Sequence, residues 1–200
     1  SGCGLVSLCV PYDLNHIFET ALVEAMTIPL PTSSSLINVS DLNHIQKNLE
    51  GKQALILGPG IGQDPRTAEL VLYLYHNVEQ PVIIDADAIN ILAAHKNQLK
   101  SPSGPRIFTP HPGELSRVID STPEEINNNR LDSAIAGCQV FKNSRHPIVF
   151  ILKGSGTIIA SDDGSIVINT TGNPGMATGG MGDVLSGIIG SLLCQGLSCH

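Results

Sequence analysis

Seven of the twenty glycines of this 200-residue chain fall in one stretch, GNPGMATGGMGDVLSGIIG at residues 172–190. Glycine costs backbone entropy in a helix, so a cluster before an apolar helical run suggests a backbone that must approach a ligand closely. Free N–H groups and the positive end of the helix dipole would converge there. With Gly179, Gly180 and Gly182 letting the chain curl around a phosphate, the stretch predicts an anion site.

Asp183 places a negative charge beside this predicted anion site. A carboxylate there repels a phosphate unless it binds a metal or acts as a base toward a hydroxyl that attacks the phosphate. The alternative role is a simple helix N-cap, for which aspartate is well suited. The spacing is not that of the P-loop, whose lysine is missing here, so that mechanism is excluded.

Two further motifs follow apolar, strand-like runs. GPGIGQD, residues 58–64, would allow a ligand to approach the carboxyl edge of a parallel sheet; alternatively, it is a tight turn in which Asp64 caps a helix from Pro65. PVIIDADAIN, residues 81–90, holds Asp85 and Asp87, which share a face for magnesium or substrate if the strand continues. Helix capping explains Asp87 better, which leaves Asp85 as the functional candidate.

Two positively charged or titratable side chains stand in short loops. In TPHPGE, residues 109–114, His111 lies between two prolines that stiffen the loop, so its imidazole is displayed for binding or is simply a surface group, and Glu114 could cap the next helix. In KGSGT, residues 153–157, Lys153 is either a solvated turn residue or a partner for a nucleotide phosphate.

The elements that must position these motifs alternate between β-rich and helical segments. This alternation predicts an α/β fold with a mostly parallel sheet and helices on its faces. The segment from residue 148 to 169 has turns at GSG and SDDG and predicts an antiparallel meander. The expected strands are 5–10, 54–57, 82–84, 107–108 and 148–152, and the expected helices are 65–77, 87–95, 112–120 and 123–145.

The last predicted helix follows the glycine cluster directly. Its apolar residues recur at helical spacing, and Gly187 and Gly190 fall on another side, where they would permit close packing. The apolar positions are Val184, Leu185, Ile188, Ile189 and Leu192.

The composition limits the classes of function. A chain that is 42% hydrophobic and 14% charged can bury one core, most plausibly as a single domain, and has no run long enough to span a bilayer. A net charge of -7 argues against a nucleic-acid surface. No lysine or arginine follows Lys153, so an anion held by the last quarter of the chain needs backbone N–H groups, a helix terminus or a metal ion.

Five cysteines without paired spacing indicate reduced thiols in a cytoplasm rather than a disulfide framework. The chain starts at Ser1 and enters a strand-like run at once, so we expect it to be a piece of a longer chain.

In chain order, GPGIGQD, PVIIDADAIN, TPHPGELSR, KGSGT and NPGMATGGMGDVLSG resemble the ADP- or ATP-dependent NAD(P)H-hydrate dehydratases, a branch of the ribokinase-like superfamily. The resemblance runs from about residue 4 to residue 195. It implies a ribokinase-like three-layer fold in one domain over residues 1–200, truncated at both ends.

The activity implied by this resemblance is the repair of NADH and NADPH hydrated at C6 of the nicotinamide ring. The nucleotide would phosphorylate the ring hydroxyl, and phosphate would then leave to restore the double bond. Asp183 would take the hydroxyl proton and contact the substrate, while Gly179, Gly180 and Gly182 would form an anion hole. The implied nucleotide contacts are Lys153, Gly154, Ser155, Gly156, Thr157 and Gly182, and the implied contacts to the hydrated dinucleotide are Gly60 and His111.

The form NPGMATGGMGD is similar to bacterial members, which implies ADP rather than ATP as donor, with Mg²⁺ as cofactor. The resemblance also implies a homo-oligomer such as a tetramer and an NAD(P)H-hydrate epimerase as a fused or separate partner. Two rival functions stay open: a ribokinase-like kinase for a small alcohol of the thiazole or hydroxymethylpyrimidine type, and a nucleotide-binding module without catalysis. The dinucleotide-type motifs favour the dehydratase over the first, and Asp183 argues against the second.

Overall fold

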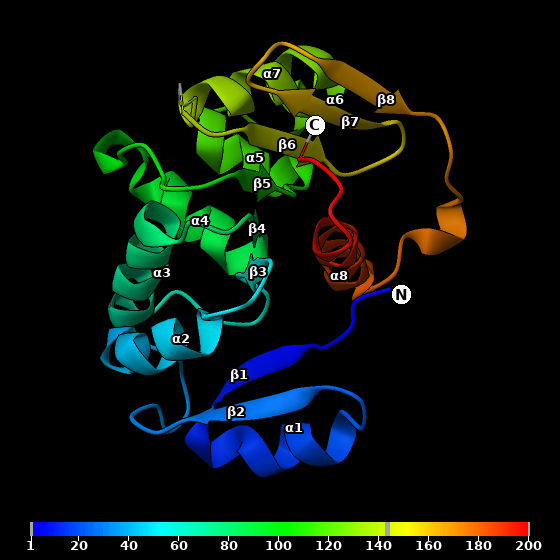
Figure 1. Cartoon of the computed structure of the whole chain (residues 1–200). Helices are drawn as coiled ribbons and strands as arrows, with labels where there is room; N and C mark the ends of the chain where they lie inside the picture. Colours follow the sequence, from blue (N-terminus) through cyan, green and yellow to red (C-terminus); the bar gives the residue numbers. More distant parts are fainter. Residues whose placement is uncertain (1, 143–144, 200) are drawn as a thin grey trace.

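A six-stranded sheet forms the centre of the computed structural model, which describes residues 2–142 and 145–199 (Figure 1). Its strands follow in sequence order across the sheet; the first four are parallel, and each of the last two pairs antiparallel with the strand before it. This confirms the predicted α/β class and the predicted meander. The strands are β3 (Leu55–Leu57), β4 (Val82–Ile84), β5 (Arg106–Phe108), β6 (Ile148–Leu152), β7 (Thr157–Ser161) and β8 (Ile166–Asn169).

A separate two-stranded parallel sheet precedes it, made of β1 (Ser7–Pro11) and β2 (Met26–Leu30) with α1 (Asn15–Ala21) between them. The sequence predicts β1 but not α1 or β2. The helix buries no side chain, so it lacks an apolar stripe, and Pro29 argues against a strand. Proline is tolerated here because both strands of a two-stranded sheet are edge strands. The chain then passes through α2 (Leu42–Leu49) to the main sheet.

Helices cover the two faces of the main sheet unequally. The larger core lies on the face that carries Phe108 and Phe150, whose rings stack with centroids 4.6 Å apart. On the opposite face, α8 (Met181–Cys194) packs Leu185 and Ile189 against a smaller cluster (Figure 1). The helices with side chains in the larger core are α3 (Pro65–Asn77), α4 (Ala86–Ala94), α5 (Pro112–Ile119), α6 (Pro123–Asn128) and α7 (Arg130–Val140).

The single helix predicted at 123–145 is wrong, because the chain breaks at Asn129 into α6 and α7. Asn129 has φ −133° and ψ 52°, outside the helical region, and it ends a run of three asparagines of low helix propensity. Residues 143 and 144 of the predicted helix lie outside the described residues. The other predicted helices agree with α3, α4 and α5 to within one residue at each end.

The apolar repeat of α8 is only partly buried. Gly190 packs as predicted, since a Cβ there would lie 3.2 Å from Cδ1 of Ile56 on β3. Gly187 faces open space, which corrects the prediction for that position. Val184, Ile188 and Leu192 are 40–53% exposed, so three of the five apolar positions of the repeat face away from the sheet. Within the part of the chain that the structure describes, no helix is both long and apolar enough to cross a membrane.

Arg106, at the start of β5, ties the sheet to the end of α3. Its guanidinium is fully buried and donates to the carbonyl oxygens of Tyr75 and Val78, both at 2.6 Å from Nη2. Burial lowers the pKa of Arg106 to about 10, and the carbonyl groups at the helix end compensate the charge.

Gly58 lets the end of β3 pass directly against β4. Its φ is +129°, and a Cβ there would lie 1.8 Å from the carbonyl oxygen of Asp85. We predict that Gly58→Ala lowers the free energy of unfolding by more than about 3 kcal/mol, because backbone strain and steric overlap add together.

The matched control is Gly62→Ala in the same loop, where φ is +73° but a Cβ would meet no atom within 4 Å. Its cost should stay near that of the left-handed backbone alone, about 1–2 kcal/mol. Urea unfolding of the three proteins measures both values, and equal losses would show that the close approach at Gly58 is unimportant.

Candidate active site

The carboxyl ends of β3 to β6 bring the predicted motifs to one edge of the sheet. The hydrogen-bond ladder extends one residue past each strand: Asp85 N donates to Leu57 O at 3.0 Å, and Thr109 N to Ile84 O at 3.1 Å. Lys153 N donates to Pro110 O at 2.9 Å. Residues that follow three different strands are therefore held at fixed positions at the edge where α/β sheets bind ligands.

Asp85 is the centre of this edge. Its side chain is 1% exposed; Oδ1 accepts from Lys153 Nζ at 2.9 Å, and Oδ2 accepts from Ser186 Oγ on α8 at 2.8 Å. Burial acts to raise the pKa of Asp85, but the hydrogen bond and charge of Lys153, with hydrogen bonds from Ser186 and Thr109, outweigh it. The pKa of this carboxyl therefore lies below its usual range, and Asp85 is ionised at neutral pH.

The ammonium group of Lys153 lies close to two carboxylates. Its Nζ lies 3.8 Å from Oε2 of Glu114, in addition to the ion pair with Asp85. Glu114 Oε1 in turn lies 3.3 Å from His111 Nε2. A continuous polar chain thus runs from His111 through Glu114, Lys153 and Asp85 to Ser186, crossing the ends of three strands and reaching α8.

His111 and Glu114 form a capping box at the start of α5. His111 Nδ1 accepts from Gly113 N at 3.0 Å and from Glu114 N at 3.3 Å, and Glu114 Oε2 accepts from His111 N at 2.8 Å. The predicted capping role of Glu114 is confirmed, and His111 caps as well. Because Nδ1 accepts hydrogen bonds, the proton of a neutral ring is on Nε2, and the imidazole is 53% exposed.

The KGSGT motif forms the turn between β6 and β7 at the same edge. Arg130, the first residue of α7, donates from Nη2 to Leu152 O at 3.1 Å and to Lys153 O at 3.3 Å. Thr157 Oγ1 donates to Gly154 O at 2.9 Å and closes the turn. Hydrogen bonds from Arg130 and Thr157 thus hold the backbone of the turn, while Gly154 and Ser155 are exposed and can contact a ligand.

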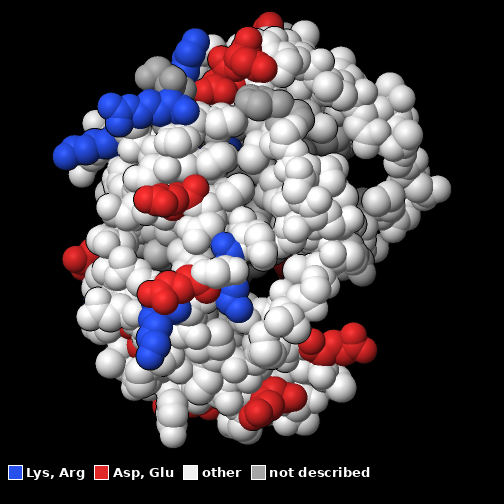
Figure 2. All heavy atoms as spheres, in the orientation of Figure 1, with Lys and Arg blue, Asp and Glu red and all other residues white. Residues whose placement is uncertain are grey.

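The glycine-rich stretch leads from β8 to α8 on the exposed side of this edge. Gly180, with φ +84°, is the N-cap of α8, and its carbonyl accepts from Val184 N at 3.0 Å. A Cβ at Gly182 would lie 3.4 Å from Lys153 Nζ and 3.7 Å from Asp85 Oδ2, so the first turn of α8 adjoins the ion pair. Figure 2 shows the right-hand side of this view, where β8 and this stretch lie, without lysine or arginine side chains.

Asp183 lies exposed in the first turn of α8. The alternative role as N-cap is wrong, because the helix begins at Met181 and its N-cap is Gly180. Within residues 2–142 and 145–199 the Asp183 carboxylate forms no hydrogen bond or ion pair. The carboxylate beside the glycine-rich stretch is therefore available to a ligand.

The loop at residues 58–64 is held by Asp87. Gly62 N donates to Asp87 Oδ2 at 2.9 Å, and Gln63 Nε2 donates to Asp87 Oδ1 at 3.0 Å. The predicted capping role of Asp87 is wrong, since Asp85 is the N-cap of α4, and the two aspartates do not face a common site. The reason is Ala86, whose φ of +49° turns the chain sharply between them. Asp64 caps α3 through Arg66 N, as predicted, and Gly60 is exposed at the loop.

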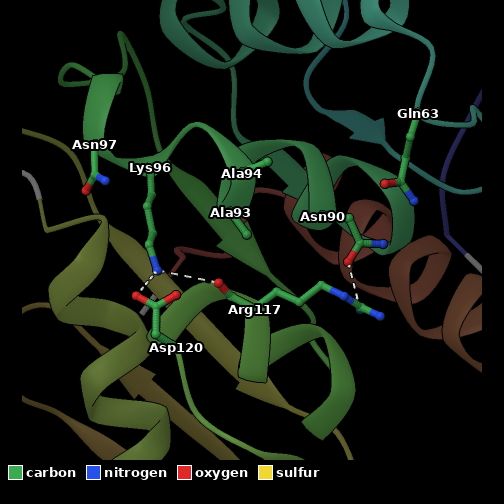
Figure 3. Close-up of a pocket in the computed structure, with 8 residues that line it drawn as sticks. All are labelled: Gln63, Asn90, Ala93, Ala94, Lys96, Asn97, Arg117 and Asp120. Carbon is green, nitrogen blue, oxygen red and sulfur yellow. Dashed lines mark hydrogen bonds and ion pairs between the residues drawn. The ribbon is translucent and has the colours of Figure 1, made fainter.

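A hollow of about 430 Å³ lies beside this edge, between α4 and α5 (Figure 3). The two cationic side chains that line it have partners within the protein. Lys96 Nζ lies 2.7 Å from Asp120 Oδ2, and Arg117 Nη1 donates to Asn90 Oδ1 at 3.0 Å. None of the residues predicted to contact the nucleotide or the dinucleotide lines this hollow. The candidate site is accordingly the sheet edge, not the hollow.

Sequence reasoning missed two residues that shape the site. Ser186 sits in an apolar helix and carries no signal beyond its position three residues after Asp183. Arg130 reaches the KGSGT turn only because the helix breaks before it, and the run of three asparagines was the available signal for that break.

Solved structures share the fold of this chain. A ribokinase-like superfamily protein from Enterococcus faecalis superposes with a TM-score of 0.72 at 26% identity, covering 96% of this chain and 62% of that protein. An ADP/ATP-dependent NAD(P)H-hydrate dehydratase from Bacillus subtilis, co-crystallized with ATP and Mg²⁺ and soaked with CoA, has a TM-score of 0.73 at 28% identity. It covers 97% of this chain and 65% of that protein. Fold and sheet edge thus define an α/β protein of the ribokinase-like class.

The sequence profile of the NAD(P)H-hydrate dehydratases matches residues 1–200, so the chain belongs to that family. The Bifunctional NAD(P)H-hydrate repair enzyme Nnr of Moorella thermoacetica is 40% identical over 198 residues, which are 98% of this chain and 36% of the relative. The protein of the same name from Escherichia coli is 39% identical over 172 residues, 85% of this chain and 32% of the relative. The chain spans about a third of the length of these curated relatives, and the family predicted from its motifs is confirmed.

The ion pair at the sheet edge should make stability depend on pH. Because the pKa of Asp85 is lower in the folded protein than in the unfolded chain, the pair stabilises fully above the unfolded pKa and loses its effect as pH falls through the folded one. We predict that Lys153→Met lowers the free energy of unfolding by roughly 3 kcal/mol at neutral pH, because it leaves a buried carboxylate unpaired.

The difference from wild type should shrink as the pH falls below about 4, since a protonated Asp85 no longer needs the cation. Lys96→Met is the control, because its partner Asp120 is 81% exposed and such pairs contribute at most about 1 kcal/mol. Urea unfolding at several pH values measures this; a Lys153→Met deficit that stays constant into acid would contradict the assignment.

Proposed function

We propose that this chain carries the nucleotide-dependent dehydration of hydrated NADH and NADPH, the repair reaction for which its relatives are named. The observation that carries the proposal is Asp183: an exposed carboxylate in the first turn of α8, immediately after a glycine that adjoins Lys153. A site that only bound phosphate would gain nothing from a carboxylate there, whereas a phosphoryl transfer to a hydroxyl needs a base.

In this mechanism, Asp183 accepts the proton of the ring hydroxyl while the hydroxyl oxygen bonds to the terminal phosphorus of the nucleotide. The bond from that phosphorus to its bridging oxygen breaks, so the donor ADP is converted to AMP, which is the leaving group. The carbon–oxygen bond of the phosphorylated ring then breaks, phosphate departs, and the adjacent ring carbon gives up a proton to form the double bond. N–H groups at the start of α8, around Gly179, Gly180 and Gly182, would stabilise the charge of the transferring group.

The turn from Lys153 to Thr157 is the proposed nucleotide contact. Its backbone is fixed by Arg130, and Gly154 and Ser155 are exposed beside the start of α8. On the other side, Gly60 and the half-exposed imidazole of His111 lie at the same edge and are proposed to contact the hydrated dinucleotide. The polar chain from His111 to Lys153 then joins the two halves of the site.

Mg²⁺ fits this edge as a companion of the nucleotide. The described residues include no group of three or more His, Cys, Asp or Glu side chains that could hold a metal alone. Mg²⁺ in phosphoryl-transfer sites keeps several waters and needs only one or two carboxylates besides the phosphates, so it requires no dedicated group of protein ligands. The three carboxylates of Asp85, Glu114 and Asp183 outweigh the two charges of Lys153 and Arg130, so a bound Mg²⁺ would supply the charge neutralisation that an anionic nucleotide requires.

We also propose ADP as the preferred donor and an NAD(P)H-hydrate epimerase activity as a partner, fused or separate. The support for the donor is the form of the glycine-rich stretch, and the support for the partner is the bifunctional name of the relatives, of which this chain spans about a third.

The first test of the function is a repair assay on the complete gene product. We predict that hydrated NADH regains the absorbance of reduced nicotinamide when Mg²⁺ and ADP are present, and that ATP is less effective. Consumption of either nucleotide only with small alcohols of the thiazole or pyrimidine type would favour the kinase alternative instead. Binding of nucleotide without any turnover would favour the non-catalytic module.

Asp183→Asn should abolish repair but keep nucleotide binding. The variant removes the base, which contributes about 10²–10⁴-fold to the rate, while its size and helix position are unchanged. The matched control is Asp163→Asn in the turn between β7 and β8, at the opposite end of the hairpin from KGSGT. Turnover assays and calorimetric titration with ADP measure the two effects, and wild-type turnover of Asp183→Asn would exclude Asp183 as the base.

A further inference from the structure

One polar contact joins α8 to the opposite part of the sheet edge. Ser186 Oγ donates to Asp85 Oδ2 at 2.8 Å, across 101 positions of the sequence. Ser186 is 0% exposed and Asp85 is 1% exposed, so water does not compete for this bond. A hydroxyl that donates to a buried carboxylate forms one of the stronger hydrogen bonds of a protein.

The apolar contacts of α8 with the sheet, as far as the structure describes them, have no direction. Leu185 and Ile189 pack on an apolar cluster, and Gly190 lies against Ile56. Apolar contacts hold a helix against a sheet but fix its rotation and its position along the axis poorly, because the hydrophobic effect is non-directional. On the outer face Val184 and Ile188 are exposed, so in the described part of the chain no second layer fixes α8 from outside.

The bond of Ser186 is therefore the directional contact that sets where the first turn of α8 lies. Asp183 is three residues before Ser186, on the neighbouring position of the helix surface. Asp85 binds Lys153 through Oδ1 and Ser186 through Oδ2, so one carboxylate fixes the KGSGT turn and the start of α8 relative to each other. A shift of α8 would move Asp183 and the N–H groups of the first turn away from Lys153.

We propose that Ser186 is a positioning residue: by donating to Asp85 it fixes the first turn of α8, and with it Asp183, against the nucleotide turn. The catalytic part of this inference rests on the proposed function of Asp183. The hydroxyl of Ser186 donates to Asp85, so the proposed effect of Ser186 is exerted through that carboxylate.

The test compares Ser186→Ala, Ser186→Thr and Ser191→Ala in the complete gene product. We expect Ser186→Ala to lower kcat for hydrate repair by about 10- to 100-fold, since a misplacement of about 1 Å has effects of this size, with the KM for ADP close to wild type. Ser186→Thr keeps the hydroxyl and should recover most of the lost kcat. Ser191→Ala removes another buried hydroxyl of α8, one that accepts from Gln195 at 3.4 Å far from Asp85, and should keep wild-type kcat.

A second measurement does not depend on the reaction. Hydrogen exchange at the amides of Val184 and Leu185, followed by mass spectrometry, should accelerate in Ser186→Ala but not in Ser191→Ala or Ser186→Thr. Unchanged exchange in Ser186→Ala, or accelerated exchange with wild-type kcat, would overturn the positioning role. If the wild-type protein repairs no hydrate, the proposed function fails, and the exchange rates still decide whether Ser186 fixes α8.

Discussion

The ion pair between Lys153 and Asp85 is the interaction on which the site depends. Asp85 follows β4 and Lys153 follows β6, with β5 between these strands in the sheet, and both side chains are largely withdrawn from water. Two charges that have lost their hydration are stable only as long as each has its partner, so the geometry of the pair is fixed. Because Lys153 also begins the turn between β6 and β7, the same requirement fixes the backbone of that turn.

The pair also explains how a region without basic side chains can take part in an anion site. From β7 to the end of the chain there is no lysine or arginine. Arg130 at the start of α7 binds carbonyl groups of the turn after β6, and the cation beside the carboxylates is Lys153 at the end of β6. Its charge is already shared by Asp85 and Glu114, which limits what it can offer to a phosphate. Backbone N–H groups at the start of α8 are then the remaining donors, and they carry no charge that the two carboxylates could capture.

Much of this arrangement follows from sequence patterns, and the exceptions have physical causes. Local signals were sufficient for the parallel strands, for Asp64 as a cap and for Glu114 in its capping box. The pattern did not predict β2, because Pro29 argues against a strand unless that strand lies at the edge of its sheet. It assigned Asp87 to a helix cap because a left-handed backbone at Ala86 is unexpected for a residue with a Cβ.

The sequence patterns did not predict the contacts between segments that are distant in the chain. The family resemblance named Asp183, Lys153 and His111, but not the groups that hold them. Ser186 meets Asp85, and Arg130 meets the turn after β6, only once the chain has folded. Such partners leave no periodic signal, since a single serine in an apolar helix or an arginine after three asparagines fits many structures equally well.

The reversal of the chain after β6 has a consequence for the glycine-rich stretch. β7 carries the chain away from the carboxyl edge, and β8 returns it to that edge without a connecting helix. Its four residues are all exposed, and β7 is its sole neighbour in the sheet. Opening such a strand costs less free energy than opening the core. The glycine-rich stretch thus lies between an exposed edge strand and a helix start that one carboxylate fixes. It can adjust to a ligand while the core stays folded.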